Sequence, residues 1–211
     1  MKKPRVKDKD VRIQEIQAAA KKVFLQKGFR NTTVEGIAKK AGISKGTVYL
    51  YFKNKQEVYI ALMMPVLEEI GRELVKLESR VLEHKYSTCK KLFEGIFKAL
   101  WHAYEYDPEG IRTLLAFLQG NHFSAMSKET LRKINARAQA NYETLRGALS
   151  HSIKLGVIKK VEIAPLADFI WGAFLGVIEV EESKFRVTKK DHAFDTLRFA
   201  FSIISDGISS P

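Results

Sequence analysis

Hydroxyl, lysine and tyrosine side chains are concentrated in one stretch of the chain, residues 33–52, which reads TVEGIAKKAGISKGTVYLYF. Its spacing predicts two short helices separated by a turn at Gly42. Thr33 can cap the first of these helices, glycine permits the sharp turn, and Ser44 can satisfy the free N–H groups of the next helix. Val48 and Phe52, four residues apart, are expected to anchor that second helix to a core. The pattern predicts a helix-turn-helix.

The outer face of the second helix carries residues suited to a major groove. Lys45 and Thr47 can reach base edges, and the tyrosine hydroxyls can bond phosphates. Gly46 lets the helix approach the DNA backbone closely. Glu35 either accepts from a cytosine amino group or points to solvent. The predicted DNA-binding residues are Thr33, Ser44, Lys45, Gly46, Thr47, Tyr49, Leu50, Tyr51 and Lys55.

The positive charge of the chain lies at the same end. Residues 1–55 hold 15 Lys/Arg and 4 Asp/Glu, a net +11, whereas residues 56–211 hold 21 and 20, a net +1. A concentrated positive field favours a polyanion through counterion release. A solvated basic surface or a disordered arm is the alternative interpretation of the charge alone.

Apolar residues recur at helical spacing along almost the whole chain, and no segment alternates apolar and polar residues over a strand's length. The fold predicted is all-α, with an N-terminal three-helix headpiece, a larger C-terminal helical domain and about nine helices in all. The first helix is expected from Asp10 to Lys27, and a long one from Asn54 to the low 80s. Further helices are expected near 88–105, 108–121, 127–155, 163–184 and 189–207.

The helix-turn-helix stretch resembles the TetR family of one-component regulators. The family pattern is Thr, then Ile-Ala-x-x-Ala-Gly-(Val/Ile)-Ser-x-Gly-Thr-x-Tyr-x-Tyr-Phe-x-x-Lys. Val58 stands where the family usually has Leu. The close resemblance covers about residues 10–70. The matching residues are Thr33, Ile37, Ala38, Ala41, Gly42, Ile43, Ser44, Gly46, Thr47, Tyr49, Tyr51, Phe52 and Lys55.

The resemblance implies a DNA-binding domain at residues 10–70, with its motif at 33–52, and an effector-binding and dimerisation domain at 71–211. It implies that the second helix reads bases while Thr33, Tyr49 and Lys55 hold phosphates. We expect a homodimeric repressor on a palindromic operator in double-stranded DNA, released by a small-molecule effector of unknown identity. No other cofactor is expected. An activator, or a regulator controlled by a protein partner, is the alternative.

Two C-terminal segments predict a surface that a second copy covers. Residues 166–178 are apolar nearly all round, so one face can serve its own domain and the others need another cover. The last helix carries a stripe at three- and four-residue steps. Burial of both helices in a monomer core is the alternative. The predicted dimer residues are Phe169, Gly172, Gly176, Phe194, Leu197, Phe201 and Ile204.

Aromatic residues of the middle helices predict the walls of an effector pocket, with asparagine as a polar anchor. An aromatic stripe at helical spacing is also typical of plain core packing. The predicted ligand-binding residues are Trp101, Tyr104, Phe117, Asn121, Phe123, Trp171 and Phe174.

Other classes of protein are disfavoured. The sequence shows no nucleophile elbow, phosphate-cradling loop or acid/base pair, so no catalytic residue is predicted and the chain is not expected to be an enzyme. The five His are scattered, and no metal ligand is predicted. The lone Cys89 and the apolar run of residues 169–178, short of the ~20 residues that span a bilayer, favour a cytoplasmic protein without a membrane partner. A basic module for anionic membranes is a distant alternative.

Overall fold

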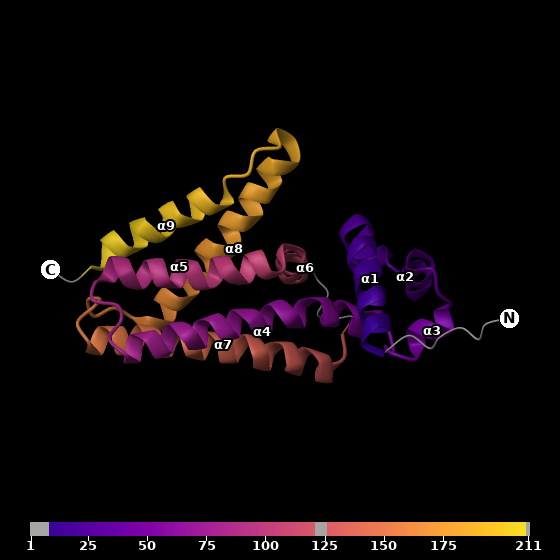
Figure 1. The fold of residues 1–211 in the computed structure, drawn as a ribbon, viewed down its shortest axis with the longest axis horizontal. Helices are drawn as coiled ribbons and strands as arrows, with labels where there is room; N and C mark the ends of the chain where they lie inside the picture. Colours follow the sequence, from indigo (N-terminus) through magenta and orange to yellow (C-terminus); the bar gives the residue numbers. More distant parts are fainter. Residues whose placement is uncertain (1–8, 121–125, 210–211) are drawn as a thin grey trace. The chain divides into compact units, whose positions relative to one another are not determined.

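A computed structural model describes residues 9–120 and 126–209 of the chain. Within these ranges it forms nine helices and no strand (Figure 1). The predicted all-α fold is confirmed. The helices are α1 Lys9–Asn31, α2 Val34–Ala41, α3 Lys45–Tyr49, α4 Lys55–Leu82, α5 Cys89–Tyr106, α6 Pro108–Gln119, α7 Lys128–Lys154, α8 Ile163–Thr188 and α9 Ala193–Ile208.

The chain divides into two compact units. We call Met1–Pro65 with Glu109–Ile134 the headpiece unit, and Val66–Pro108 with Asn135–Pro211 the C-terminal unit. The chain therefore passes from one unit to the other inside α4, at the start of α6 and inside α7. The sequence assigned everything after residue 70 to one domain. In the structure, most of α6 and the start of α7 belong with the headpiece instead.

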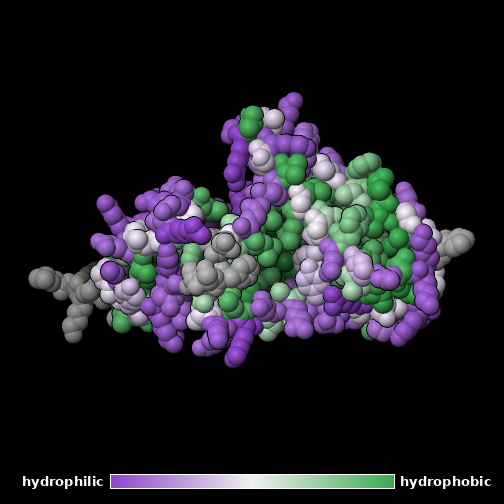
Figure 2. Space-filling model, turned by 180° about the vertical axis from the view of Figure 1, so that it is seen from behind, coloured by the Kyte–Doolittle hydropathy of each residue, from purple (hydrophilic) through white to green (hydrophobic). Residues whose placement is uncertain are grey.

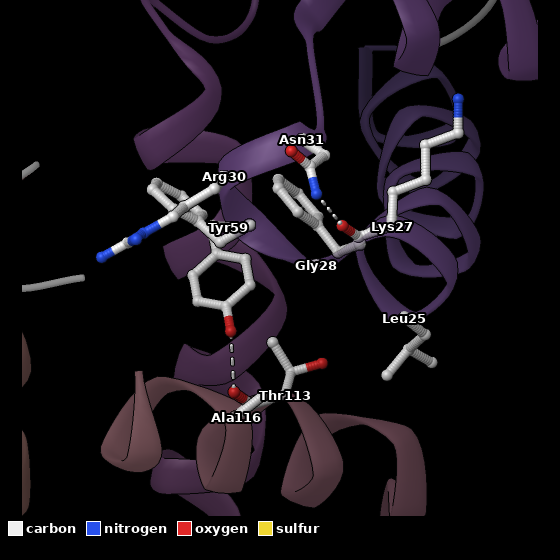
Figure 3. A pocket seen from close by; sticks show the side chains of 10 residues that line it. Leu25, Lys27, Gly28, Arg30, Asn31, Tyr59, Thr113 and Ala116 are labelled. Carbon is white, nitrogen blue, oxygen red and sulfur yellow. Dashed lines mark hydrogen bonds between the residues drawn. The ribbon is translucent and has the colours of Figure 1, made fainter. Parts of the chain in front are cut away.

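The headpiece unit is built around a cluster of aromatic rings. Tyr59 of α4 packs on Phe24 and Phe29 of α1, with ring centroids 4.8 and 5.0 Å apart. The Tyr59 hydroxyl donates to the carbonyl oxygen of Thr113 in α6 at 3.1 Å (Figure 3). Burial raises the pKa of Tyr59 to about 12. These contacts explain why α6 belongs to the headpiece unit.

The first helix bends at Gly28 rather than ending there. Gly28 has φ 71° and ψ 169°, a conformation that strains residues with a side chain. One more helical turn follows, to Asn31, and the Thr32 hydroxyl donates to the Gly28 carbonyl at 2.8 Å. The regular first helix is thus interrupted at Gly28, where the sequence predicted its end, and a further short turn follows the kink.

In the C-terminal unit, α9 packs against α5. The rings of Phe93 and Phe201 lie 6.5 Å apart, and those of Phe97 and Phe194 lie 5.2 Å apart. The buried carboxylate of Glu181 in α8 accepts hydrogen bonds from Lys184 and from Thr196 of α9, at 2.8 and 3.1 Å. The hydrogen bond from Lys184 holds the pKa of Glu181 below its ordinary value. The last two helices are thus tied together by a polar contact as well as by apolar packing.

Helix α8 is long and apolar enough to cross a membrane by length and composition alone. The expectation that no segment has that length rested on the shorter run of residues 169–178. In the structure one face of α8, including Ile170, Phe174 and Ile178, is fully buried within the C-terminal unit. A helix in the core of a packed unit can be equally long and apolar, so length and composition alone are weak evidence for a membrane span.

Candidate nucleic-acid interface

The turn between α2 and α3 is fixed by backbone hydrogen bonds. Gly42 has φ 67° and ψ 31°, in the left-handed region, and its N–H donates to Lys39 O at 3.2 Å. The N–H of Ile43 reaches back to Ala38 O at 3.1 Å. This pair of bonds is the Schellman arrangement, which ends a helix where a glycine follows. It sets the direction in which α3 leaves α2.

Side-chain oxygens cap the two helices of the motif. Thr33 Oγ1 accepts from Gly36 N at 3.0 Å, and Ser44 Oγ accepts from Thr47 N at 3.1 Å. The hydroxyls of Ser44 and Thr47 also lie 2.8 Å apart, within hydrogen-bond distance. Both caps were predicted from the sequence. Their contacts with DNA stay predictions.

Helix α3 has one buried anchor and a broad exposed face. Val48 is fully buried and Phe52 nearly so, as the four-residue spacing predicts. Tyr49 is 47% exposed and Leu50 is 80% exposed. Apolar and aromatic surface exposed side by side next to Lys45 is typical of a binding surface. The regular helix ends at Tyr49 instead of Phe52, so the exposed Leu50 and the half-buried Tyr51 lie on the turn that follows.

The charges around this face are positive. Lys39 and Lys40 of α2, Lys45 of α3 and Lys53 are all exposed. Glu35 is exposed as well, which agrees with the interpretation that it points to solvent. This surface combines cations, hydroxyls and aromatic rings on a short capped helix, as recognition of duplex DNA requires.

Lys55 is used inside the headpiece unit. Its ammonium donates to the carbonyl oxygens of Phe29, Arg30 and Thr32 at 2.9, 3.1 and 3.0 Å, and lies 4.6 Å from the centre of the Phe29 ring. Burial lowers the pKa of this lysine. The resemblance assigned Lys55 to a phosphate. The structure gives its donors to the end of α1, so a phosphate would have to displace one of these carbonyls.

Lys55→Met should therefore destabilise the fold and leave the electrostatics of DNA binding unchanged. Loss of the three carbonyl contacts is expected to cost about 1–3 kcal/mol in the free energy of unfolding, measured with denaturant. The salt dependence of operator binding should stay unchanged.

Lys45→Ala is the matched comparison, since it removes an exposed cation. It should lower the slope of log K against log salt by about 1 for each bound headpiece, because one cation near the DNA is lost. A slope that falls equally in Lys55→Met would restore the phosphate assignment.

The residues predicted to wall an effector pocket lie in three separate ring groups. Trp101 packs with Tyr104 and Phe194, with centroids 5.1 Å away in both cases. Phe117 packs 6.5 Å from Tyr59, in the headpiece unit. Trp171 lies 6.3 Å from Phe174 and 5.6 Å from Tyr142. None of these predicted residues lines a described cavity, and Asn121 and Phe123 fall outside the described residues.

The described rings lie in two units, where they pack against neighbouring aromatic rings. Their role as the walls of an effector pocket stays a prediction. A metal centre is not indicated, since no group of three or more His, Cys, Asp or Glu comes together within residues 9–120 and 126–209.

The predicted dimer residues of α9 need correction. Leu197 and Phe201 are buried within the C-terminal unit, where Phe201 packs on α5. The apolar residues that α9 exposes are Phe199, at 66%, Ile203, at 56%, and the predicted Phe194, at 41%. The stripe in the sequence was real, but it is the inner face of the helix.

An apolar groove lies between the exposed faces of α8 and α9. Its volume is about 510 Å³, and Phe169 of α8 lies beside Phe199 and Ile203 of α9 in its lining, with the nearly buried Ile204. Gly172 and Gly176 are exposed on α8, and no atom lies within 4 Å of a Cβ added to either. Figure 2 shows a continuous hydrophobic area over this unit. Phe169, Gly172, Gly176 and Ile204 therefore remain candidates for an interface.

An N-terminal helix-turn-helix with an exposed basic reading helix, followed by a larger helical unit, defines a DNA-binding transcriptional regulator. The family profile described as "Bacterial regulatory proteins, tetR family" matches residues 16–62. The chain therefore carries, at these residues, a DNA-binding domain that matches the TetR family of regulators.

Relatives extend the likeness over the whole chain. The "Fatty acid metabolism regulator protein" of Bacillus subtilis is 26% identical over 201 residues, covering 94% of this chain and 95% of its own. The structure of FadR from Bacillus subtilis, in complex with stearoyl-CoA, matches with TM-score 0.69 and 23% identity over 92% of this chain and 98% of that one. A putative fatty acid metabolism regulator of Clostridium perfringens matches with TM-score 0.72 and 22% identity, over 93% and 100%. At these identities the structural matches establish the shared fold.

Proposed function

We propose that this regulator is a homodimeric repressor that leaves its operator when it binds a long-chain acyl-CoA. The single observation that carries the choice of effector is the end-to-end match to the Bacillus subtilis fatty acid metabolism regulator. A protein of the same fold holds stearoyl-CoA. A cytoplasmic location follows from this proposal, because both operator and acyl-CoA are found there.

Buried donors in the C-terminal unit support an effector with oxygen acceptors. Trp171 Nε1 and Arg146 Nε are buried without a hydrogen-bond partner. The guanidinium of Arg146 lies 5.6 Å from the ring centre of Tyr142, which in turn packs on Trp171. Buried donors are nearly always satisfied in proteins. A carbonyl or phosphate oxygen of a ligand would satisfy them here.

The dimer is supported by the groove between α8 and α9. The side chains of Phe169, Phe199 and Ile203 expose apolar surface that their own unit leaves uncovered. A second copy, related by a two-fold axis, covers the same patch with its own. Two headpieces can then meet half-sites about 34–36 Å apart, one helical turn of DNA.

Footprinting on genomic fragments around the gene for this protein tests the first part of the proposal. A protected near-palindrome is expected at moderate salt without effector. Stearoyl-CoA should then release the protein, with an operator Kd raised at least tenfold, a coupling of about 1.4 kcal/mol. Coenzyme A alone is the control and should leave the Kd unchanged.

Transcription from the protected promoter in vitro separates the two modes of regulation. Transcript should fall when the protein is added and recover with stearoyl-CoA; a rise on addition would make it an activator. No preference for any fragment over random duplex would refute the DNA-binding assignment. A preference for one fragment that does not respond to stearoyl-CoA would refute only the proposed effector.

A further inference from the structure

A small cleft opens between α5 and α9 of the C-terminal unit, which lie side by side (Figure 1). Its volume is about 70 Å³. One water molecule needs about 10–15 Å³ of cavity, so the cleft has room for about five to seven water-sized groups. The groove between α8 and α9 is lined by other residues. The cleft is lined by Lys90, Phe93, Glu94, Phe97, Arg198, Phe201, Ser202 and Ser205.

The hydroxyl of Ser205 is the buried polar group of this cleft. Ser205 is only 1% exposed, and its Oγ has no hydrogen-bond partner within the described residues. Helical serines commonly donate to a carbonyl of the preceding turn, as Ser202 Oγ does to Phe199 O at 2.8 Å. A buried hydroxyl without a partner is uncommon in proteins. An acceptor atom of a ligand in the cleft would satisfy it.

The backbone of Ser205 is held in place by two other side chains. Cys89 Sγ of α5 donates to Ser205 O at 3.3 Å, and Ser209 Oγ donates to the same oxygen at 2.8 Å. These bonds keep the end of α9 on α5. The hydroxyl of Ser205 is therefore positioned before any ligand arrives, which lowers the entropy cost of binding.

Positive charge predominates around the cleft. Lys90 of α5 and Arg198 of α9 are exposed at its edge, as is Glu94. The carboxylate of Glu94 is already paired with Lys98 Nζ at 3.0 Å. That hydrogen bond lowers the pKa of Glu94, and the nearby charges of Arg198 and Lys90 lower it further. One carboxylate is thus accompanied by three cations, so a bound anion is favoured over a bound cation.

The interior of the cleft is aromatic. Phe93, Phe97 and Phe201 are almost fully buried, and the ring centroid of Phe201 lies 6.5 Å from that of Phe93 and 6.2 Å from that of Phe97. Such a wall suits a hydrocarbon group better than a fully hydrated ion. Ligand sites commonly combine apolar walls with a few placed polar groups. The lining therefore fits a ligand with an anionic end and a short apolar end.

We propose that this cleft binds a short-chain aliphatic carboxylate. The carboxylate accepts from the Ser205 hydroxyl and pairs with Arg198 and Lys90 through charge-assisted hydrogen bonds. The hydrocarbon end lies on the phenylalanine rings. The volume is too small for a long acyl chain, so this ligand is a second one. The inference does not rest on the proposed acyl-CoA, because the buried donors cited for that effector belong to other residues.

Calorimetry with butyrate tests the site in the purified full chain, in a buffer free of other carboxylates. Saturable binding of one butyrate per chain is expected. Butyramide, which has the same shape without the charge, and butylamine, which has the opposite charge, should bind at least about tenfold more weakly. Equal binding of either compound, or no saturable binding of butyrate, would overturn the proposal. Inorganic phosphate that binds as tightly as butyrate would overturn the assignment to an organic acid.

Ser205→Ala and Ser202→Ala locate the bound butyrate. Both hydroxyls border the cleft, but that of Ser202 is donated to its own helix. Ser205→Ala should raise the butyrate Kd at least about fivefold, whereas Ser202→Ala should change it by less than about twofold. Without ligand, Ser205→Ala should not lower the free energy of unfolding, because the hydroxyl that it removes is unpaired. Equal Kd values for the two variants would overturn the role of Ser205.

Arg198→Met tests the charge with a substitution at an exposed position, which should leave the fold intact. It should raise the butyrate Kd at least about fivefold, because the carboxylate loses a charged donor. Arg186→Met, at an exposed position of α8 outside the cleft, is the control and should change the Kd by less than about twofold. Butyrate affinity that survives in Arg198→Met would place the ligand elsewhere and overturn the site, whatever the outcome for Ser205→Ala.

Discussion

Tyr49→Ala is expected to weaken operator binding by about thirtyfold or more. A lost contact of about 1 kcal/mol in each headpiece amounts to about 2 kcal/mol for a dimer on two half-sites. Tyr49 is exposed on α3 beside the exposed Lys45, and Val48 holds the helix without it, so the fold should not change. Fluorescence anisotropy with the footprinted operator and with random duplex measures the effect. Tyr49→Phe separates the hydroxyl, which suits a phosphate, from the ring.

Tyr106→Ala is the control for this experiment. Tyr106 is also an exposed tyrosine, at 56%, but it lies in the C-terminal unit, and its loss should leave affinity unchanged. If the two alanine variants bind the operator equally well, α3 is not the reading helix. Loss of affinity for operator and random duplex alike would assign Tyr49 to a phosphate, as the family resemblance implies.

Ile203→Asp should convert the dimer to a monomer. A carboxylate in the groove between α8 and α9 would be buried without a partner in both copies, which is strongly unfavourable. Operator affinity should then drop at least about a hundredfold, because a single headpiece makes half of the contacts. Sedimentation velocity measures the mass, and anisotropy measures the binding.

Val75→Asp provides the comparison for the dimer. Val75 is 54% exposed on α4, in the C-terminal unit, and lies outside the groove. It should leave both mass and affinity unchanged. A protein that stays dimeric with Ile203→Asp would show that the groove is not the interface, even if the operator is still bound.

The helix-turn-helix could be predicted from the sequence because its signals are local. Thr33, Gly42 and Ser44 each act on backbone groups within four residues, and the structure shows the expected capping bonds for all three. The anchors Val48 and Phe52 are also recognisable from spacing within a single helix turn. Most helix boundaries follow from the same kind of signal.

The distant contacts could not be predicted in this way. The partners of Lys55 lie more than twenty residues away in sequence, and Gln17 reaches a carbonyl in another helix. Periodicity showed that α9 has an apolar stripe, but not that Phe201 faces α5 while Phe199 faces outward, because both faces are apolar. The assignment of α6 to the headpiece unit depends on Tyr59, whose hydroxyl donates to the carbonyl oxygen of Thr113, 54 residues away in the sequence.

Gly42 has a consequence for the chirality of the residue at the turn. Its angles, φ 67° and ψ 31°, mirror those of a right-handed helix, so they are the ordinary conformation of a D-amino acid. Apart from its chain neighbours, no atom lies within 4 Å of a Cβ placed there. Handedness rather than size therefore disfavours side chains of natural configuration at this turn, although His84 and Lys189 adopt a similar positive φ elsewhere in the chain. A D-alanine introduced by chemical synthesis would fit the turn and would restrict the unfolded chain as well.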